Sequence, residues 1–153
     1  MSKRIDKIAE LLQAHPKAFF IFSNGLTSRE ASYFHREDRC FYLLHGMGEA
    51  LSIGVGFAKA QPDTEVVVVD GDGNALMGLA SWSLMPVKNL YYYILANGVH
   101  ETTGGQKVPS FPFVPDWCNI VETSIGQEGT PNPPGPSEIM TSCQKWLTNN
   151  ING

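Results

Sequence analysis

The stretch VVVVDGDGNALMG, residues 66–78, decides the fold of this 153-residue chain. Four consecutive valines predict a strand that is buried on both faces, as strands of parallel sheets are. A glycine-rich turn follows, and residues that favour helices begin at Ala75. Such turns usually bind phosphate through backbone N–H groups and the positive end of the helix. The carboxylates of Asp70 and Asp72 would repel a phosphate, so this turn needs another explanation.

Outward from this stretch, apolar runs alternate with helical patterns along the chain. On connections long enough for crossovers, the alternation predicts an α/β three-layer sandwich with a mainly parallel sheet. Ser2 and Ser137 are expected to cap the first and last helices. Gly54 and Gly56 would each weaken a helix by about 1 kcal/mol relative to Ala, which indicates close packing against a neighbour. We expect strands at residues 18–23, 40–44, 65–70, 89–95 and 118–125, and helices at about 3–15, from about 28, and at 50–60, 75–84 and 137–147.

The composition fits a single domain spanning residues 1–153 and disfavours several classes of function. The net charge of −4, without a basic stripe, gives nucleic-acid binding little support. No segment approaches the roughly 18 consecutive apolar residues of a membrane span, and the amphipathic amino terminus is unlike a signal peptide. We therefore expect a cytoplasmic protein without a membrane partner. Three cysteines without a CxxC pair predict reduced thiols rather than a disulfide framework or a zinc site.

Two segments lack a periodic pattern. Residues 98–117 are rich in Gly, Pro and hydroxyl side chains, and we interpret them as a long active-site loop, because long loops in compact domains are often functional. Residues 126–136 read as a proline-rich turn.

Three interpretations of the turn DGDGNALMG compete. A dinucleotide-binding turn is disfavoured because Gly71, Gly73 and Gly78 miss the GxGxxG spacing. A calcium loop is weaker still, because Ala75 stands where that loop has glycine and Ser81 where it has a bidentate glutamate. In the third interpretation, a carboxylate of the turn holds a divalent cation, and the cation holds the phosphates.

The third interpretation explains the carboxylates and predicts a second ligand. Mg²⁺ commonly takes one or two oxygen ligands from the protein and completes its octahedron with phosphate oxygens and water. Asp72 would be one ligand, and Asn97 follows the next apolar strand. Both would lie at the carboxyl edge of a parallel sheet, where open α/β sheets bind their ligands. Asp70 would orient the turn and stay outside the site.

These residues resemble the signature of thiamine diphosphate enzymes, which is GDG, a spacer and then a pair of asparagines. GDG stands at 71–73, and Asn97 matches the second asparagine, whereas Ala96 replaces the first. The resemblance implies a thiamine diphosphate-binding fold in which Asp72, Asn97 and the backbone carbonyl of Val99 bind the metal.

The stretches SNGLTSRE, HGMGEALSIGVGFA and NGVHETTGGQ narrow the resemblance to the phosphonopyruvate and sulfopyruvate decarboxylases, over residues of about 20–107. The likeness implies that Met47 is the wedge that bends the cofactor. A flexible, apolar Met between glycines suits that place. Asn74 would also cap the following helix near a phosphate. The cofactor-binding residues implied together are Asn24, Gly25, His45, Gly46, Met47, Gly71, Asp72, Gly73, Asn74, Asn97 and Val99.

The residues after Asn97 would face the substrate. His100 is the candidate catalytic residue, because it could donate to an anionic group or shuttle a proton, although a structural hydrogen bond is an equal alternative. Thr102, Thr103 and Gln106 are candidate contacts for a phosphonate or sulfonate.

The resemblance implies a split enzyme. The chain would be the diphosphate-binding (beta) subunit of a thiamine diphosphate and Mg²⁺-dependent carboxy-lyase acting on 3-phosphonopyruvate or sulfopyruvate, releasing CO₂ and an aldehyde. A pyrimidine-binding (alpha) subunit would supply the activating glutamate, so we expect a hetero-oligomer. The alternatives are a carboligase or 2-oxoacid oxidase subunit, or a non-catalytic regulatory subunit. After TGGQ the chain is shorter and richer in proline than that family, which favours the regulatory alternative.

Overall fold

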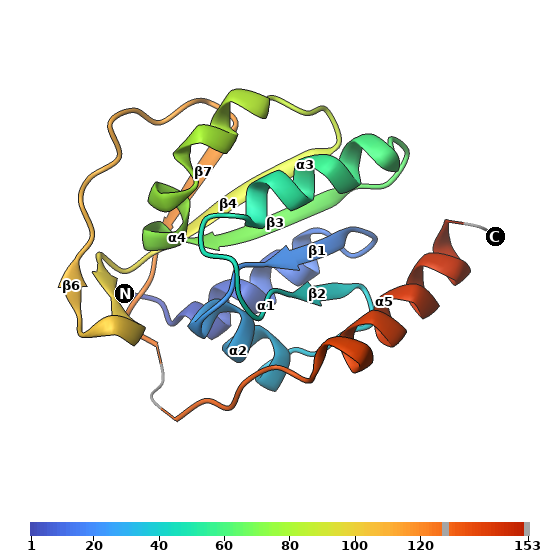
Figure 1. Ribbon diagram of the computed structural model, residues 1–153, viewed down its shortest axis with the longest axis horizontal. Coiled ribbons are helices and arrows are strands. Elements are labelled where there is room, and N and C mark those ends of the chain that lie inside the picture. Colours follow the sequence, from blue (N-terminus) through green and yellow to red (C-terminus); the bar gives the residue numbers. More distant parts are fainter. Residues whose placement is uncertain (127–128, 152–153) are drawn as a thin grey trace.

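A five-stranded parallel sheet forms the centre of the computed structural model, which describes residues 1–126 and 129–151 (Figure 1). The order of the strands is β2-β1-β3-β4-β7, and each strand runs parallel to its neighbours. The predicted parallel sheet is therefore confirmed. The strands are β1 (Phe19–Phe22), β2 (Cys40–Tyr42), β3 (Val66–Gly71), β4 (Leu90–Ala96) and β7 (Cys118–Glu122).

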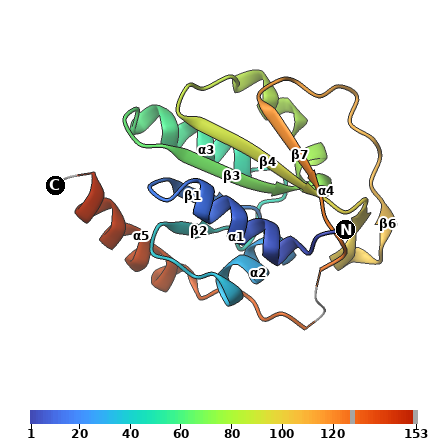
Figure 2. The ribbon, with the colours of Figure 1, turned by 180° about the vertical axis from the view of Figure 1, so that it is seen from behind.

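Helices cover both faces of the sheet, which confirms the three-layer sandwich (Figures 1 and 2). Phe19 stacks on Phe57 with ring centroids 4.5 Å apart and also contacts Trp146 at 5.4 Å, so the helices that carry these two rings share one face. The next residue, Phe20, points the other way and meets His15 at the end of the first helix. The helices are α1 (Arg4–Ala14) and α2 (Leu26–Phe34) on one face, and α3 (Ala50–Ala60) and α5 (Pro136–Asn150) on the other.

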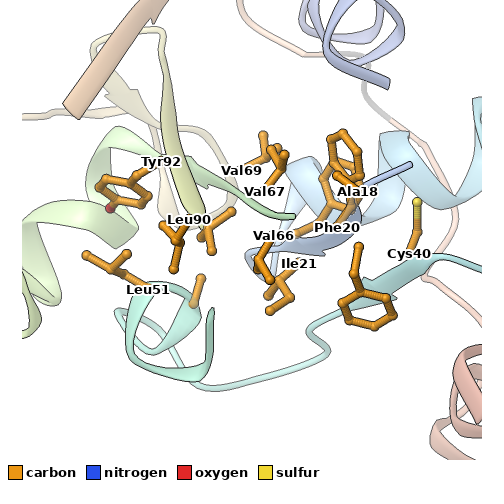
Figure 3. Packing of buried hydrophobic residues seen from close by; sticks show 14 of the residues in the cluster. Ala18, Phe20, Ile21, Cys40, Leu51, Val66, Val67, Val69, Leu90 and Tyr92 are labelled. Carbon is orange, nitrogen blue, oxygen red and sulfur yellow. The ribbon is translucent and has the colours of Figure 1, made fainter. Parts of the chain in front are cut away.

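The four valines of β3 lie at the centre of the core. All four are completely buried, and successive side chains point to opposite faces, so that Val67 and Val69 lie on one side and Val66 on the other (Figure 3). This two-sided burial is the reason that the strand reads as a continuous apolar run. The four valines are held on both sides, because β1 pairs with each of them and β4 pairs with the whole of the strand.

The two helix glycines differ in their surroundings. A Cβ at Gly54 would overlap Cγ2 of Val68, so close packing explains this glycine as predicted. Nothing lies within 4 Å of the corresponding position at Gly56, where the prediction of close packing is wrong. The helix crosses β3 at Gly54 and exposes Gly56 to solvent.

Several predicted helix ends are displaced. Lys3 rather than Ser2 is the N-cap of α1, and Gly135 rather than Ser137 is the N-cap of α5, whose first residue is Pro136. Proline suits that first position because it lacks the N–H that would be unsatisfied there. The helix expected from about residue 28 begins two residues earlier, and the helix expected over 75–84 consists of α4 (Asp72–Met77) and the 3₁₀ helix η1 (Leu79–Leu84).

The predicted long loop contains a small hairpin. Strand β5 (Val99–His100) pairs antiparallel with β6 (Gln106–Lys107), and the 3₁₀ helix η2 (Glu101–Thr103) lies between them. Residues 127 and 128 of the predicted proline-rich turn lie outside the described residues. The three cysteines are free and buried, as reduced thiols should be. Among the helices that the structure describes, none is long and apolar enough to cross a membrane.

Candidate functional site

The candidate site lies where the strand order reverses. From β1 the chain moves outward to β2 and then returns to β3 on the other side, so the loops after β1 and β3 diverge at the carboxyl edge. Open parallel sheets bind ligands in the crevice that such a reversal opens. Asn74, which follows β3, connects this region to the loops after β1 and β2. Its side chain donates a hydrogen bond to the carbonyl of Asn24 after β1 (3.3 Å) and accepts one from Gly48 N after β2 (3.0 Å).

Asp72 is the first residue of α4 and is only 6% exposed. Its Oδ1 accepts a hydrogen bond from its neighbour Gly73 N at 3.0 Å, and its Oδ2 accepts one from Gly98 N at 2.8 Å. The second bond joins the loop after β3 to the loop after β4. Within the described residues, no Lys, Arg or His forms an ion pair with this carboxylate. A buried carboxylate is costly unless a cation compensates it, so the site favours a bound cation.

Asn97 follows β4 and presents an amide to the same region. Its Oδ1 accepts a bond from Val99 N at 3.0 Å, and its Nδ2 donates to Oε1 of Glu101. An amide oxygen has two acceptor positions, so one remains for a metal ion. No group of three His, Cys, Asp or Glu side chains in the described chain could hold a metal by itself. One carboxylate, one amide and a backbone carbonyl nevertheless suit Mg²⁺, which takes its other ligands from phosphates and water.

A small cavity of about 90 Å³ joins these groups. Most of the predicted site residues line it, so the fold brings together positions that are up to 78 residues apart in the sequence, from 24 to 102. Asp70 does not line the cavity. The predicted residues around it are Asn24, Gly25, Met47, Gly71, Asp72, Gly73, Asn74, Asn97, Val99, His100 and Thr102.

Four predicted residues lie elsewhere. His45 lines a neighbouring groove that also contains Arg29 and does not include the candidate metal ligands Asp72, Asn97 and Val99. Gly46 has a φ of +83° beside Glu49, in the loop that leads to α3. Thr103 and Gln106 are exposed and bond to one another across the end of the hairpin, with 3.2 Å between the hydroxyl and the amide oxygen.

The His100 ring packs directly on the glycine turn. A Cβ at Gly73 would come within 2.5 Å of Cε1 and 2.6 Å of Nδ1 of that ring, so any other residue there would displace the ring. Gly48 allows two backbone segments to approach each other closely, because a Cβ at this position would lie 2.8 Å from Gly78 N. Met47 precedes Gly48 and is 44% exposed at the rim of the cavity.

Asp70 is buried at the end of β3, directly before the glycine turn. The hydroxyl of Tyr92 donates to its Oδ2 at 2.8 Å, and Gly71 N donates to its Oδ1 at 3.0 Å. Burial raises the pKa of the Asp70 carboxyl from 3.8 to about 6, while these hydrogen bonds favour the charged form. Its position is consistent with a role in orienting the turn.

Two charged residues that line the cavity were missed by sequence reasoning. Arg4 and Glu101 form an ion pair at 2.6 Å, although they are 97 residues apart. Glu101 follows NGVH, and an acid four residues after the proposed amide ligand could have been noticed. Arg4 in the first turn of an amphipathic helix reads as a solvated charge, and its burial depends on contacts that are remote in the sequence.

Comparison with known proteins finds similarity over the part of the chain that contains most of the residues lining the cavity. The family model described as thiamine pyrophosphate enzyme, C-terminal TPP binding domain, matches residues 23–130. Over 103 residues, 65% of the chain, it is 43% identical to a phosphonopyruvate decarboxylase of Streptomyces hygroscopicus and covers 25% of that protein. It is 41% identical over 109 residues, 69% of the chain, to the sulfopyruvate decarboxylase subunit beta of Methanocaldococcus jannaschii and covers 57% of it. The chain thus spans a quarter to under three fifths of these relatives.

Proposed function

Because the chain belongs to the thiamine pyrophosphate enzymes, as a C-terminal TPP-binding domain, we propose that it is the diphosphate-binding subunit of a thiamine diphosphate-dependent 2-oxoacid decarboxylase. The proposed substrate is an anionic 2-oxoacid, 3-phosphonopyruvate or sulfopyruvate, and the products are CO₂ and an aldehyde. The observation that carries the proposal is the buried Asp72 carboxylate, which is bound to Gly98 N beside Asn97 and has no protein cation paired with it in the described residues. A Mg²⁺ ion would balance this charge and join it to a diphosphate.

Each part of the cavity has a proposed task. Asp72, Asn97 and the carbonyl of Val99 would hold Mg²⁺, and Asn74 keeps the surrounding loops in place through its two hydrogen bonds. When bound, thiamine diphosphate supplies the electron sink for the departing CO₂. His100 lies on the glycine turn, from which it would donate to an anionic substrate or hold a proton.

The remaining assignments are proposals as well. Met47 would support the bent cofactor, His45 and Gly46 would present backbone to its pyrimidine, and Thr102 would face the substrate. Thr103 and Gln106, which lie outside the cavity, stay predictions from the sequence, as does the cytoplasmic localisation.

A second subunit is part of the proposal. The cavity measures about 90 Å³, whereas sites that enclose a small molecule usually measure about 300–1,000 Å³. The chain would therefore enclose the diphosphate end and contact the rings of the cofactor along one side only, so that another surface would cover the rest. A pyrimidine-binding partner that supplies the activating glutamate would provide that surface. Two of the relatives are named as subunit beta, which implies a second subunit in those proteins. The active form would be a hetero-oligomer.

The test is reconstitution with the partner. The chain is co-expressed with a pyrimidine-binding subunit, and CO₂ release from phosphonopyruvate, sulfopyruvate and pyruvate is measured with thiamine diphosphate and Mg²⁺. We expect release from one of the two anionic substrates, and loss of it in Asp72→Ala but not in the exposed control Asp63→Asn. Release from pyruvate alone, or an acyl transfer or oxidation without aldehyde, would favour another thiamine enzyme. Cofactor binding without any turnover would favour a regulatory subunit.

A further inference from the structure

Three charged residues from distant segments lie buried beside the metal ligands. Arg4 comes from α1, Glu30 from α2 and Glu101 from η2. Their side chains are 5%, 1% and 8% exposed, respectively. Arg4 binds both carboxylates, Glu101 at 2.6 Å and Glu30 at 3.4 Å. In Figures 1 and 2 the amino terminus lies beside the hairpin that carries η2. A surface helix thus reaches the candidate metal site through one side chain.

Glu101 is the centre of this cluster. Its Oε1 accepts hydrogen bonds from Nη2 of Arg4 at 2.6 Å, from Gly126 N at 2.9 Å and from Nδ2 of Asn97. Three donors converge on one oxygen, so the carboxylate is held firmly in one orientation. Its Oε2 is buried and has no hydrogen-bond partner in the described residues, so the contacts on the other oxygen alone hold the group.

The chain after β7 closes over the cluster. A Cβ at Gly126 would come within 2.5 Å of both Nη1 of Arg4 and Oε1 of Glu30, and within 3.0 Å of Oε2 of Glu101. A side chain at this position would have to displace the ends of these charged side chains, whereas glycine lets the backbone approach and donate its N–H without moving them. The side chains of the cluster are largely buried, which makes the hydrogen bonds to the carboxylate stronger than they would be at the surface.

The bond from Asn97 to Glu101 decides which end of the amide faces Glu101 and which end is left to bind a metal ion. An amide has a donating nitrogen and an accepting oxygen, and only the oxygen can bind Mg²⁺. A carboxylate accepts and does not donate, so Glu101 selects the nitrogen end. The oxygen is then turned to the other side, where Val99 N donates to it at 3.0 Å.

We propose that Glu101 is a positioning residue of the metal site, which orients the Asn97 amide with its oxygen toward the cavity, and that Arg4 holds Glu101 in place. This proposal rests on the proposed function, because it takes Asn97 as a ligand of Mg²⁺. Groups that orient metal ligands commonly change metal affinity by about 10–100-fold when they are removed. The first turn of α1 is thereby part of the metal site, although it does not touch the metal.

Substitutions at Glu101 separate orientation from charge. Glu101→Gln keeps an oxygen that can accept from Asn97, Glu101→Asp keeps the charge for Arg4 but is one methylene too short to reach the amide, and Glu101→Ala removes both. Each variant is co-expressed with the pyrimidine-binding subunit, and Mg²⁺ is titrated calorimetrically at saturating thiamine diphosphate. We expect the Gln complex to bind Mg²⁺ within about threefold of wild type, and the Asp and Ala complexes to bind it about 10–100-fold more weakly.

Controls distinguish this role from a structural one. Glu138→Ala removes a glutamate from an exposed ion pair with Arg36 and should leave Mg²⁺ affinity unchanged. Thermal unfolding without cofactor or metal reports the structural contribution of each variant separately. Wild-type Mg²⁺ affinity in folded Asp and Ala complexes, or Gln affinity as weak as that of Ala, would overturn the proposal. If Ala does not fold, the Asp and Gln variants decide. A wild-type complex that binds thiamine diphosphate without Mg²⁺ would overturn the metal assignment itself, and the positioning role with it.

Discussion

Two glycines on one helix should respond in opposite ways to the same substitution. Gly54 and Gly56 are both inside α3, so Gly→Ala raises the helix propensity equally at either position, by about 1 kcal/mol. At Gly54 the new methyl group would overlap Cγ2 of Val68 and lie 3.4 Å from Cδ1 of Leu90. At Gly56 it would meet nothing within 4 Å. The sign of each effect therefore depends on packing alone.

The magnitudes follow from the surroundings. Val68 is completely buried in a strand that is paired on both sides, so it cannot move aside, and the helix must shift instead. Overpacking costs about 1–3 kcal/mol, and an overlap with a fixed, branched side chain belongs to the upper part of that range, about 2–3 kcal/mol, which exceeds the gain in propensity. We expect Gly54→Ala to lower the free energy of unfolding by about 1–2 kcal/mol. Gly56→Ala should raise it by about 0.5–1 kcal/mol.

Urea unfolding followed by circular dichroism measures both effects. With an m-value of about 2 kcal/mol/M, the midpoints of the two variants should differ by about 1 M at unchanged m. Adding Val68→Ala to Gly54→Ala removes the overlap, so the double variant should be more stable than the sum of the single changes predicts, by about 1 kcal/mol. A Gly54→Ala protein at or above the wild-type midpoint, or a double variant that is simply additive, would refute the packing argument.

Three further predictions concern the site. In the complex with the partner, Asp72→Asn should weaken Mg²⁺-dependent binding of thiamine diphosphate at least 100-fold, because a neutral amide does not balance the charge of the cation. Calorimetry that shows unchanged affinity would contradict the metal site. Gly73→Ala should displace the ring of His100 and lower kcat by about 100-fold, while the affinity for Mg²⁺ changes little. An unchanged kcat would show that the position of this ring is unimportant for turnover. Gly48→Ala, at a φ of +83° and against Gly78 N, should lower the free energy of unfolding by about 1–3 kcal/mol in urea, and a neutral result would count against the close backbone contact.

The elements with a local signal were predictable. The valine run, the turn after it and the apolar strand before Asn97 each have a pattern that a few neighbouring residues define. Helix ends were less predictable, because Ser2 and Ser137 have the chemistry of caps, whereas the caps observed are Lys3 and Gly135. Pro136 begins the last helix through its restricted backbone, which overrides the capping preference of the serine that follows.

By itself the sequence determined the α/β class and the placement of the carboxylate turn at Asp72 and of Asn97 at one edge of the sheet, because strand ends in a parallel sheet share one edge whatever the details of packing. Only the tertiary structure decided that Gly54 and not Gly56 lies against the sheet, and that Arg4 reaches Glu101 across 97 positions of sequence. The physical reason is the same in both cases. Periodicity reports which side of an element is apolar, whereas a close approach or a buried ion pair depends on how whole elements pack, which no local pattern encodes.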